Sequence, residues 1–268
     1  MKFDSNLAWK EASAAISANR EVVLALAGVF FLVPGLATAL LFPVPQPTAG
    51  MDSKETAAVI ASYYSSILPF MLPLFVFQAA GTLALLTLLT DRSRPTVREA
   101  IRSGARGVFP YVLAQLLLGV AVGLIGGLVL AVGSATGLGA LTMAGIAVVG
   151  LLVIYAAIKT SLVGPVIVAE GERNPVAALK RSWLLTKGNS LRVGVFYLLV
   201  GLVFLIVTSV IVAVAGIVVA LIGGPHAGEL AGAVISAALN AVMALYFVAI
   251  VAATHRQLAG TSPSGVFE

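Results

Sequence analysis

The chain contains no cysteine, and only 10% of its residues are charged. The lack of cysteine excludes disulfide bonds, thiolate catalysis and cysteine metal sites. The scarcity of charge argues against a soluble fold, because a soluble chain of 268 residues needs a polar shell around its core. Apolar residues dominate instead and make up 60% of the chain.

Charges are missing from several long stretches. None occurs in Ser65–Thr90, Val193–His226 or Leu230–Thr254, and Val108–Ala169 contains only Lys159. A helix needs about 20 apolar residues to cross a hydrocarbon layer roughly 30 Å thick, so each stretch is long enough. Backbone groups in lipid must be hydrogen-bonded within the segment, and these runs do not alternate in polarity. We therefore expect helices and not a barrel.

We predict six spans in a single polytopic membrane domain, residues 1–268. The predicted spans are Val22–Phe42, Ser65–Thr90, Val108–Gly133, Leu141–Ala169, Val193–Ile222 and Ala231–Thr254. The proline-rich segment Pro43–Thr56 is expected to form an exposed loop. The charged N-terminal stretch has no apolar signal-peptide core, so the first span should act as an uncleaved signal-anchor.

Basic residues set the expected orientation. Of the 16 Lys and Arg residues, 14 precede the first span, follow the last, or lie between spans two and three or four and five. Only Lys54 falls on the other side, and Lys159 is within a span. The positive-inside rule then predicts a multi-pass protein of the bacterial inner membrane with both termini cytoplasmic.

The basic segments predict amphipathic helices that lie in the membrane interface. Asn174 and Pro175 form a helix start signal, followed by an apolar stripe of Val176, Leu179 and Trp183. The residues expected to meet anionic lipid headgroups or the interface are Arg94, Arg98, Arg102, Arg106, Lys180, Arg181, Lys187, Trp9 and Trp183.

Each basic segment precedes a pair of spans, which predicts an internal repeat over residues 3–90, 94–169 and 174–254. The alternative is that basic linkers precede alternate spans in any multispan protein. The expected fold is an all-α integral membrane protein. Its six transmembrane helices would form three hairpins, each preceded by a cytoplasmic amphipathic interfacial helix.

Lys159 is the one ionisable residue well inside a predicted span. Such residues often mark a binding or transport site. The alternative is that its stem extends toward the headgroups and the amine meets a lipid phosphate. The sequence has no Gly-rich phosphate loop, nucleophile elbow or paired carboxylates, so we expect no catalysis, no metal and no cofactor.

One part of the chain supports a family resemblance. Residues 159–171 contain Lys159, Pro165 and Glu170, and residues 174–189 contain an Ala-Leu-Lys-Arg-Ser-Trp-Leu-Leu-Thr helix. This pattern resembles the YciC-like integral membrane proteins, which are related to the membrane domain of some glycerophosphodiester phosphodiesterases. The resemblance implies a bacterial inner-membrane protein without an assigned reaction. It makes Lys159, Glu170, Ser182, Trp183 and Lys187 candidate functional residues.

Three functions remain open. The first is a non-catalytic protein that organises or senses lipid, with the phospholipid bilayer and its anionic headgroups as partners. The second is a permease or channel for a small solute or a lipid. The third is a subunit of a cell-envelope complex, with a homo-oligomer or an envelope protein as partner. Nucleic acid is not expected, because the positive charge lies beside the spans.

Overall fold

The structure is a computed structural model, and it describes residues 2–45, 50–91 and 95–260. Over these ranges the chain is helical and forms no strand. Its elements are α1 (Ser5–Ala18), α2 (Arg20–Ala27), the π-helical turn η1 (Gly28–Leu32), α3 (Val33–Leu41), α4 (Ser53–Thr90), α5 (Val97–Ala135), α6 (Gly139–Thr160), α7 (Val163–Ala169), α8 (Pro175–Leu185), α9 (Ser190–Gly223) and α10 (Pro225–Leu258).

Six helical segments of the described chain are long and apolar enough to cross a membrane, which confirms the predicted number. They are Arg20–Leu41, Lys54–Thr90, Val97–Ala135, Gly139–Ala169, Ser190–Gly223 and His226–Leu258. The first combines α2, η1 and α3, and the fourth combines α6 and α7. Both are therefore irregular helices.

Helix α4 begins earlier than predicted. The expected loop Pro43–Thr56 ends at Asp52, because Asp52 and Glu55 form a capping box. The Glu55 amide donates to Asp52 Oδ1 over 2.7 Å, and the Asp52 amide donates to Glu55 Oε2 over 3.1 Å. This exchange satisfies amides that have no partner within the helix, so helix formation starts here.

The expected interfacial helix before the third span is not a separate element. Its basic stretch forms the first turns of α5, which runs unbroken to Ala135. The face that packs is Ala100, Gly104 and Gly107, whereas the apolar residues Val97 and Ile101 are exposed. Gly104 explains the difference, because a Cβ there would lie 2.7 Å from the backbone nitrogen of Ala84. The stretch therefore packs directly against α4.

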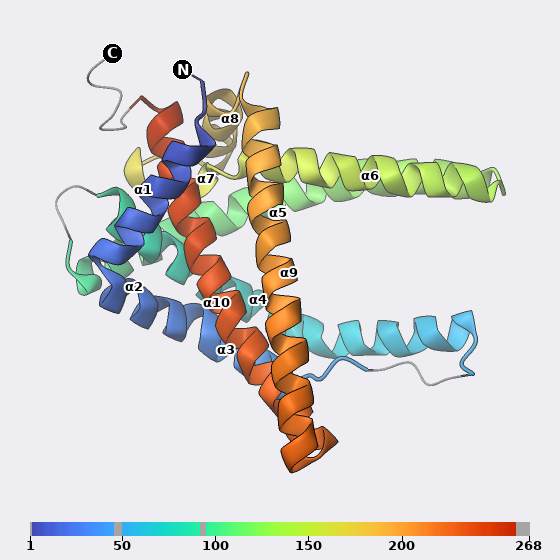
Figure 1. The fold of residues 1–268 in the computed structure, drawn as a ribbon. Helices are drawn as coiled ribbons and strands as arrows, with labels where there is room; N and C mark the ends of the chain where they lie inside the picture. Colours follow the sequence, from blue (N-terminus) through green and yellow to red (C-terminus); the bar gives the residue numbers. More distant parts are fainter. Residues whose placement is uncertain (1, 46–49, 92–94, 261–268) are drawn as a thin grey trace.

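Two long helix pairs diverge from a shared end of the molecule. Helices α5 and α6 extend together in one direction, while α9 and α10 run in another (Figure 1). The α5–α6 pair is antiparallel, since Gly126 approaches Val149 and Gly133 approaches Leu141. At the shared end, α1, α7 and α8 pack with the neighbouring ends of α9 and α10. We call this assembly, together with the first turns of α5, where Gly107 approaches Ile167 of α7, the polar end.

The main core connects the polar end to the first and last spans. It is built from large apolar side chains of α2, η1, α4 and α10, among them Val23, Phe30, Leu83, Leu86 and Ile250. Because these residues lie in candidate spans, van der Waals packing, and not removal of apolar surface from water, is the main favourable contribution between these elements. It fixes the elements that carry the candidate site.

Candidate functional site

The centre of the site is a break between α6 and α7, and helix α8 packs against this break. Ser182 of α8 is fully buried and contacts both sides of the break. Its hydroxyl donates to the Lys159 carbonyl over 2.8 Å and accepts from the Leu162 amide over 3.2 Å. A break leaves a donor and an acceptor without helical partners. One hydroxyl satisfies both, so α8 holds the break in place.

The sequence of α7 explains where the break falls. Pro165 has no amide proton and its ring clashes with the carbonyl four residues earlier, at Ser161. Gly164 brings α7 close to α4, since a Cβ there would lie 2.7 Å from Leu86 Cδ1. The proline thus interrupts the helix, and the glycine allows the second segment to pack against α4.

Lys159 is buried at the end of α6, between two aromatic rings. Its Nζ atom lies 5.1 Å from the ring centroid of Trp183 and 5.8 Å from that of Tyr155. The two rings meet edge to face at 5.5 Å. Within the described ranges, no carboxylate pairs with this ammonium group. Cation–π contact is therefore its main stabilising interaction in the structure.

Glu170, just after α7, joins three elements. Its carboxylate accepts from Arg181 Nε of α8 over 2.8 Å and from His255 Nε2 of α10 over 2.9 Å. A carboxylate can only accept, so Nε2 carries the proton. Burial acts to raise the pKa of Glu170, but the hydrogen bonds from Arg181 and His255 outweigh it and leave the pKa below its ordinary value. Glu170 is therefore ionised at neutral pH.

Hydrogen bonds to Asn189 and to α10 hold the N-terminal segment and helix α1 at the same end. The Phe3 amide donates to Asn189 Oδ1 over 2.9 Å. The Asp4 backbone exchanges two hydrogen bonds with the Gln257 side chain. Arg256 donates to the Leu89 carbonyl over 2.8 Å and to Glu11 over 3.3 Å. The N-terminal helix is thereby held against α10.

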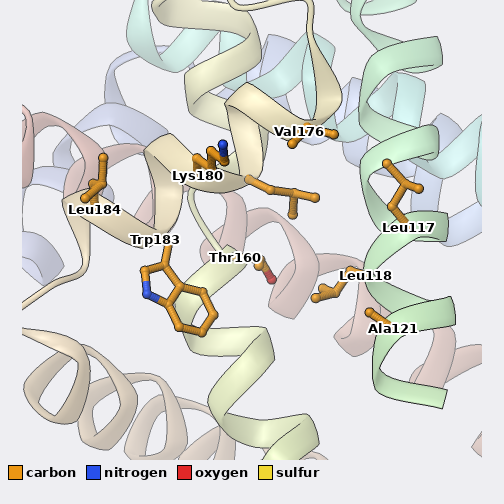
Figure 2. A pocket seen from close by; sticks show the side chains of 9 residues that line it. Leu117, Leu118, Ala121, Thr160, Val176, Lys180, Trp183 and Leu184 are labelled. Carbon is orange, nitrogen blue, oxygen red and sulfur yellow. The ribbon is translucent and has the colours of Figure 1, made fainter. Parts of the chain in front are cut away.

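A groove lies beside α8, where α5 and α6 meet it (Figure 2). Its volume is about 540 Å³. The side chains that line it are Leu117, Leu118, Ala121, Thr160, Val176, Leu179, Lys180, Trp183 and Leu184. The predicted apolar stripe of α8 thus faces this groove, and the opposite side of α8, with Ala178 and Ser182, is buried. Of the described residues, Lys180 contributes the one charged side chain on its wall.

The remaining predicted interface residues have different surroundings in the structure. Arg98, Arg102, Arg106 and Lys187 are exposed, whereas Arg94 lies outside the described residues. Trp9 of α1 is stacked on Tyr246 of α10, with ring centroids 5.5 Å apart. Arg181 was predicted to meet lipid, but in the structure its Nε is bound by Glu170.

Sequence reasoning missed His255, Gln257 and Asn189 as members of the polar end. All three are buried. The available signal was their polarity beside long apolar spans, since a polar side chain there needs a partner. Their partners, Glu170, Asp4 and Phe3, are distant in sequence and cannot be read from local spacing.

These features define a multi-pass helical membrane protein with a polar end built around a broken fourth span. Over residues 10–258 the chain matches a family described as a domain of unknown function, DUF7847, and it belongs to that family. The match provides no link to the YciC-like proteins or to glycerophosphodiester phosphodiesterases. No curated protein and no solved structure matches the chain.

Proposed function

We propose that this protein is a non-catalytic membrane protein that binds anionic lipid headgroups at its polar end. The supporting observation is an imbalance of charge there. Glu170 is engaged by Arg181 and His255, and Glu11 by Arg256. Arg98, Arg102, Arg106, Lys180 and Lys187 are exposed and form no ion pair with a described residue. Glu170 and Glu11 are used in these internal pairs, and Glu99 and Glu172 accept from backbone amides, so the five cations are left for an external anion.

The proposal includes an orientation. The polar end would face the cytoplasm, where anionic lipids give the leaflet a negative surface potential. Helix α8 would lie in the interface with its apolar stripe toward the hydrocarbon. The proposed location is the bacterial inner membrane, as the resemblance to YciC-like proteins also implies. Reporter fusions between Gly50 and Met51 and after the C-terminus should report opposite compartments.

Lipid selectivity tests the function. The full chain is placed in nanodiscs made from mixed phosphatidylglycerol and phosphatidylcholine, and the lipids retained after transfer to detergent are quantified. We expect enrichment of phosphatidylglycerol that is lost near 1 M salt, where the Debye length is about 3 Å.

Matched variants test whether the enrichment depends on the exposed arginines of α5 and not on a change in the fold. Charge reversal at Arg98, Arg102 and Arg106 should abolish the enrichment, whereas Lys54→Glu, at the far end of α4, should not. Equal enrichment in the parent and the triple variant would refute the proposal. Helicity by circular dichroism verifies that each variant is folded.

A specific observation supports a permease as the second candidate. A hollow of about 390 Å³ lies between α3, α4 and α10, and three uncharged polar side chains line it: Gln78, Ser236 and Asn240. Its wall also includes Phe31 of η1. Irregular helical turns of this type are frequent at functional sites. The polar lining suits a neutral solute that accepts and donates hydrogen bonds.

Solute flux tests this second candidate. Proteoliposomes containing the parent or Asn240→Leu are exposed to an osmotic step of glycerol or urea, and volume recovery is followed by light scattering. Faster recovery in the parent than in the variant supports the permease. Recovery equal to that of protein-free liposomes for both solutes rejects it for this solute class.

A further inference from the structure

We infer that the groove between α5 and α8 is a stoichiometric site for one anionic phospholipid, with an acyl chain in the groove and the phosphate on Lys180. This inference rests on the proposed lipid function and makes it more specific. It names one site and one lipid among the many that surround the molecule.

The shape and lining of the groove suit an acyl chain. Its volume of about 540 Å³ is within the range of roughly 300–1,000 Å³ typical of ligand pockets. Both walls are apolar, with Leu117, Leu118 and Ala121 on α5 and Val176 and Leu179 on α8. The Thr160 hydroxyl on the wall donates to the carbonyl of Ala156. Hydrogen bonding to its own helix makes that hydroxyl compatible with an apolar ligand.

The α8 wall presents apolar surface that the chain itself does not cover. Val176 is 48% exposed, Trp183 43% and Leu184 59%. The other side of α8 is held by the buried Ser182 at the α6–α7 break. Because this bond fixes α8 relative to α6, the groove is a preformed feature. A preformed groove reduces the ordering cost of binding.

Charge at the rim identifies the headgroup as anionic. Lys180 is exposed, lines the groove, and forms no ion pair with a described residue. Its neighbour Arg181 has its Nε bound to Glu170, so Lys180 is the available cation at this position. Among the described residues, no acidic side chain lines the groove. An ammonium group beside an apolar slot complements a lipid phosphate beside its acyl chain.

Trp183 adds a second feature expected of a lipid site. Its ring lies on the groove wall in Figure 2 and also covers the Lys159 ammonium group. Tryptophan is enriched at the level of lipid headgroups because its ring is apolar and its N–H is polar. The same side chain thus shields a buried cation on one side and borders the groove on the other.

Native mass spectrometry and photocrosslinking test the site on the full chain. The parent in detergent is titrated with phosphatidylglycerol and with phosphatidylcholine that carry the same acyl chains. We expect one phosphatidylglycerol to bind at least tenfold more tightly than the next. A phosphatidylglycerol with a diazirine in its acyl chain should crosslink to residues 117–121 and 175–185 of the unaltered protein.

Two variants with matched controls test separately the contact with the acyl chain and the contact with the headgroup. Ala121→Phe fills the groove and should weaken the first adduct at least tenfold, whereas Ala131→Phe, exposed further along α5, should not. Lys180→Gln should remove the preference over phosphatidylcholine, and Lys54→Gln should keep it. Crosslinks elsewhere, an unchanged adduct in Ala121→Phe, or a protein dimer that only Ala121→Phe abolishes would each overturn the inference.

Failure of this inference is distinguishable from failure of the proposed function. Salt-sensitive enrichment of phosphatidylglycerol depends on the arginines of α5 and should persist in Ala121→Phe. If enrichment persists but the parent binds no preferred first lipid, the groove site is wrong and the general function stands. If the parent shows no enrichment at all, the proposed function is wrong and the groove site fails with it.

Discussion

The Ser182 hydroxyl donates to the carbonyl of Lys159, 23 residues earlier in the chain, over 2.8 Å. The same oxygen accepts from the Leu162 amide on the other side of the helix break. These two bonds fix α8 against the break in the fourth span, although a loop separates α8 from that span. They also fix the groove wall relative to Lys159 and its aromatic neighbours.

Removal of the Ser182 hydroxyl should destabilise the protein. Ser182→Ala leaves the buried Lys159 carbonyl and Leu162 amide without partners, at a cost of about 1–3 kcal/mol each in the general case. We expect a clear fall in the thermal unfolding midpoint in detergent. Ser66→Ala is the control, because that exposed hydroxyl bonds only within its own helix. Equal midpoints for Ser182→Ala and the parent would contradict the assigned role.

The Lys159–Trp183 contact should give a measurable coupling energy. In a double-mutant cycle with Lys159→Met and Trp183→Leu, we expect about 0.5–2 kcal/mol from unfolding free energies, because the indole face attracts the ammonium group. Trp183→Phe should retain part of it, since a ring remains. The same cycle with Trp9, which stacks on Tyr246 away from this site, should give zero coupling. Zero coupling for both pairs would show that the contact contributes nothing.

Glu170 should make stability depend on acid pH. Its pKa in the folded protein is below the ordinary value of 4.5, so its ionised form stabilises the fold above that pH. The contribution is lost as pH falls from about 4.5 through the folded pKa. Unfolding midpoints of the parent should therefore fall more steeply in this window than those of Glu170→Gln. Glu229→Gln, at an exposed position, should follow the parent. Parallel curves for all three proteins would refute the prediction.

The close approach of α5 to α4 should not tolerate a side chain. Gly104→Ala would place a Cβ 2.7 Å from the Ala84 nitrogen and 3.1 Å from the Ala80 carbonyl oxygen, both backbone atoms. Overpacking of this kind costs about 1–3 kcal/mol. Gly119→Ala, on the same helix with nothing within 4 Å, is the matched control and should change stability little. Similar effects of both changes on the unfolding midpoint would argue against this packing.

Some polar details could be predicted from sequence because they are local. Asn174 and Pro175 start α8 as expected, and the Asn174 side chain accepts from the amides of Val176 and Ala177. The stripe of Val176, Leu179 and Trp183 shares one face of that helix for the same reason. Such features depend on spacings of one to four residues, which the chain specifies directly.

The basic stretch at the start of α5 shows where local spacing is insufficient to predict how a helix packs. Arg98, Arg102 and Arg106 have the four-residue period of an amphipathic helix, and they are exposed as that period indicates. The opposite face packs against α4 and continues into the span, which the period alone does not reveal. The deciding residue is Gly104, whose role depends on a neighbour twenty positions away.

The sequence by itself determined the number of candidate membrane-spanning segments and the start of α8. Hydrocarbon requires long apolar runs, and caps act within four residues. Only the tertiary structure decided that Glu170 binds Arg181 and His255, that Arg256 binds Glu11, and that Ser182 bridges a broken helix. These partners are brought together by packing between helices, so no local pattern in the chain encodes which of them meet.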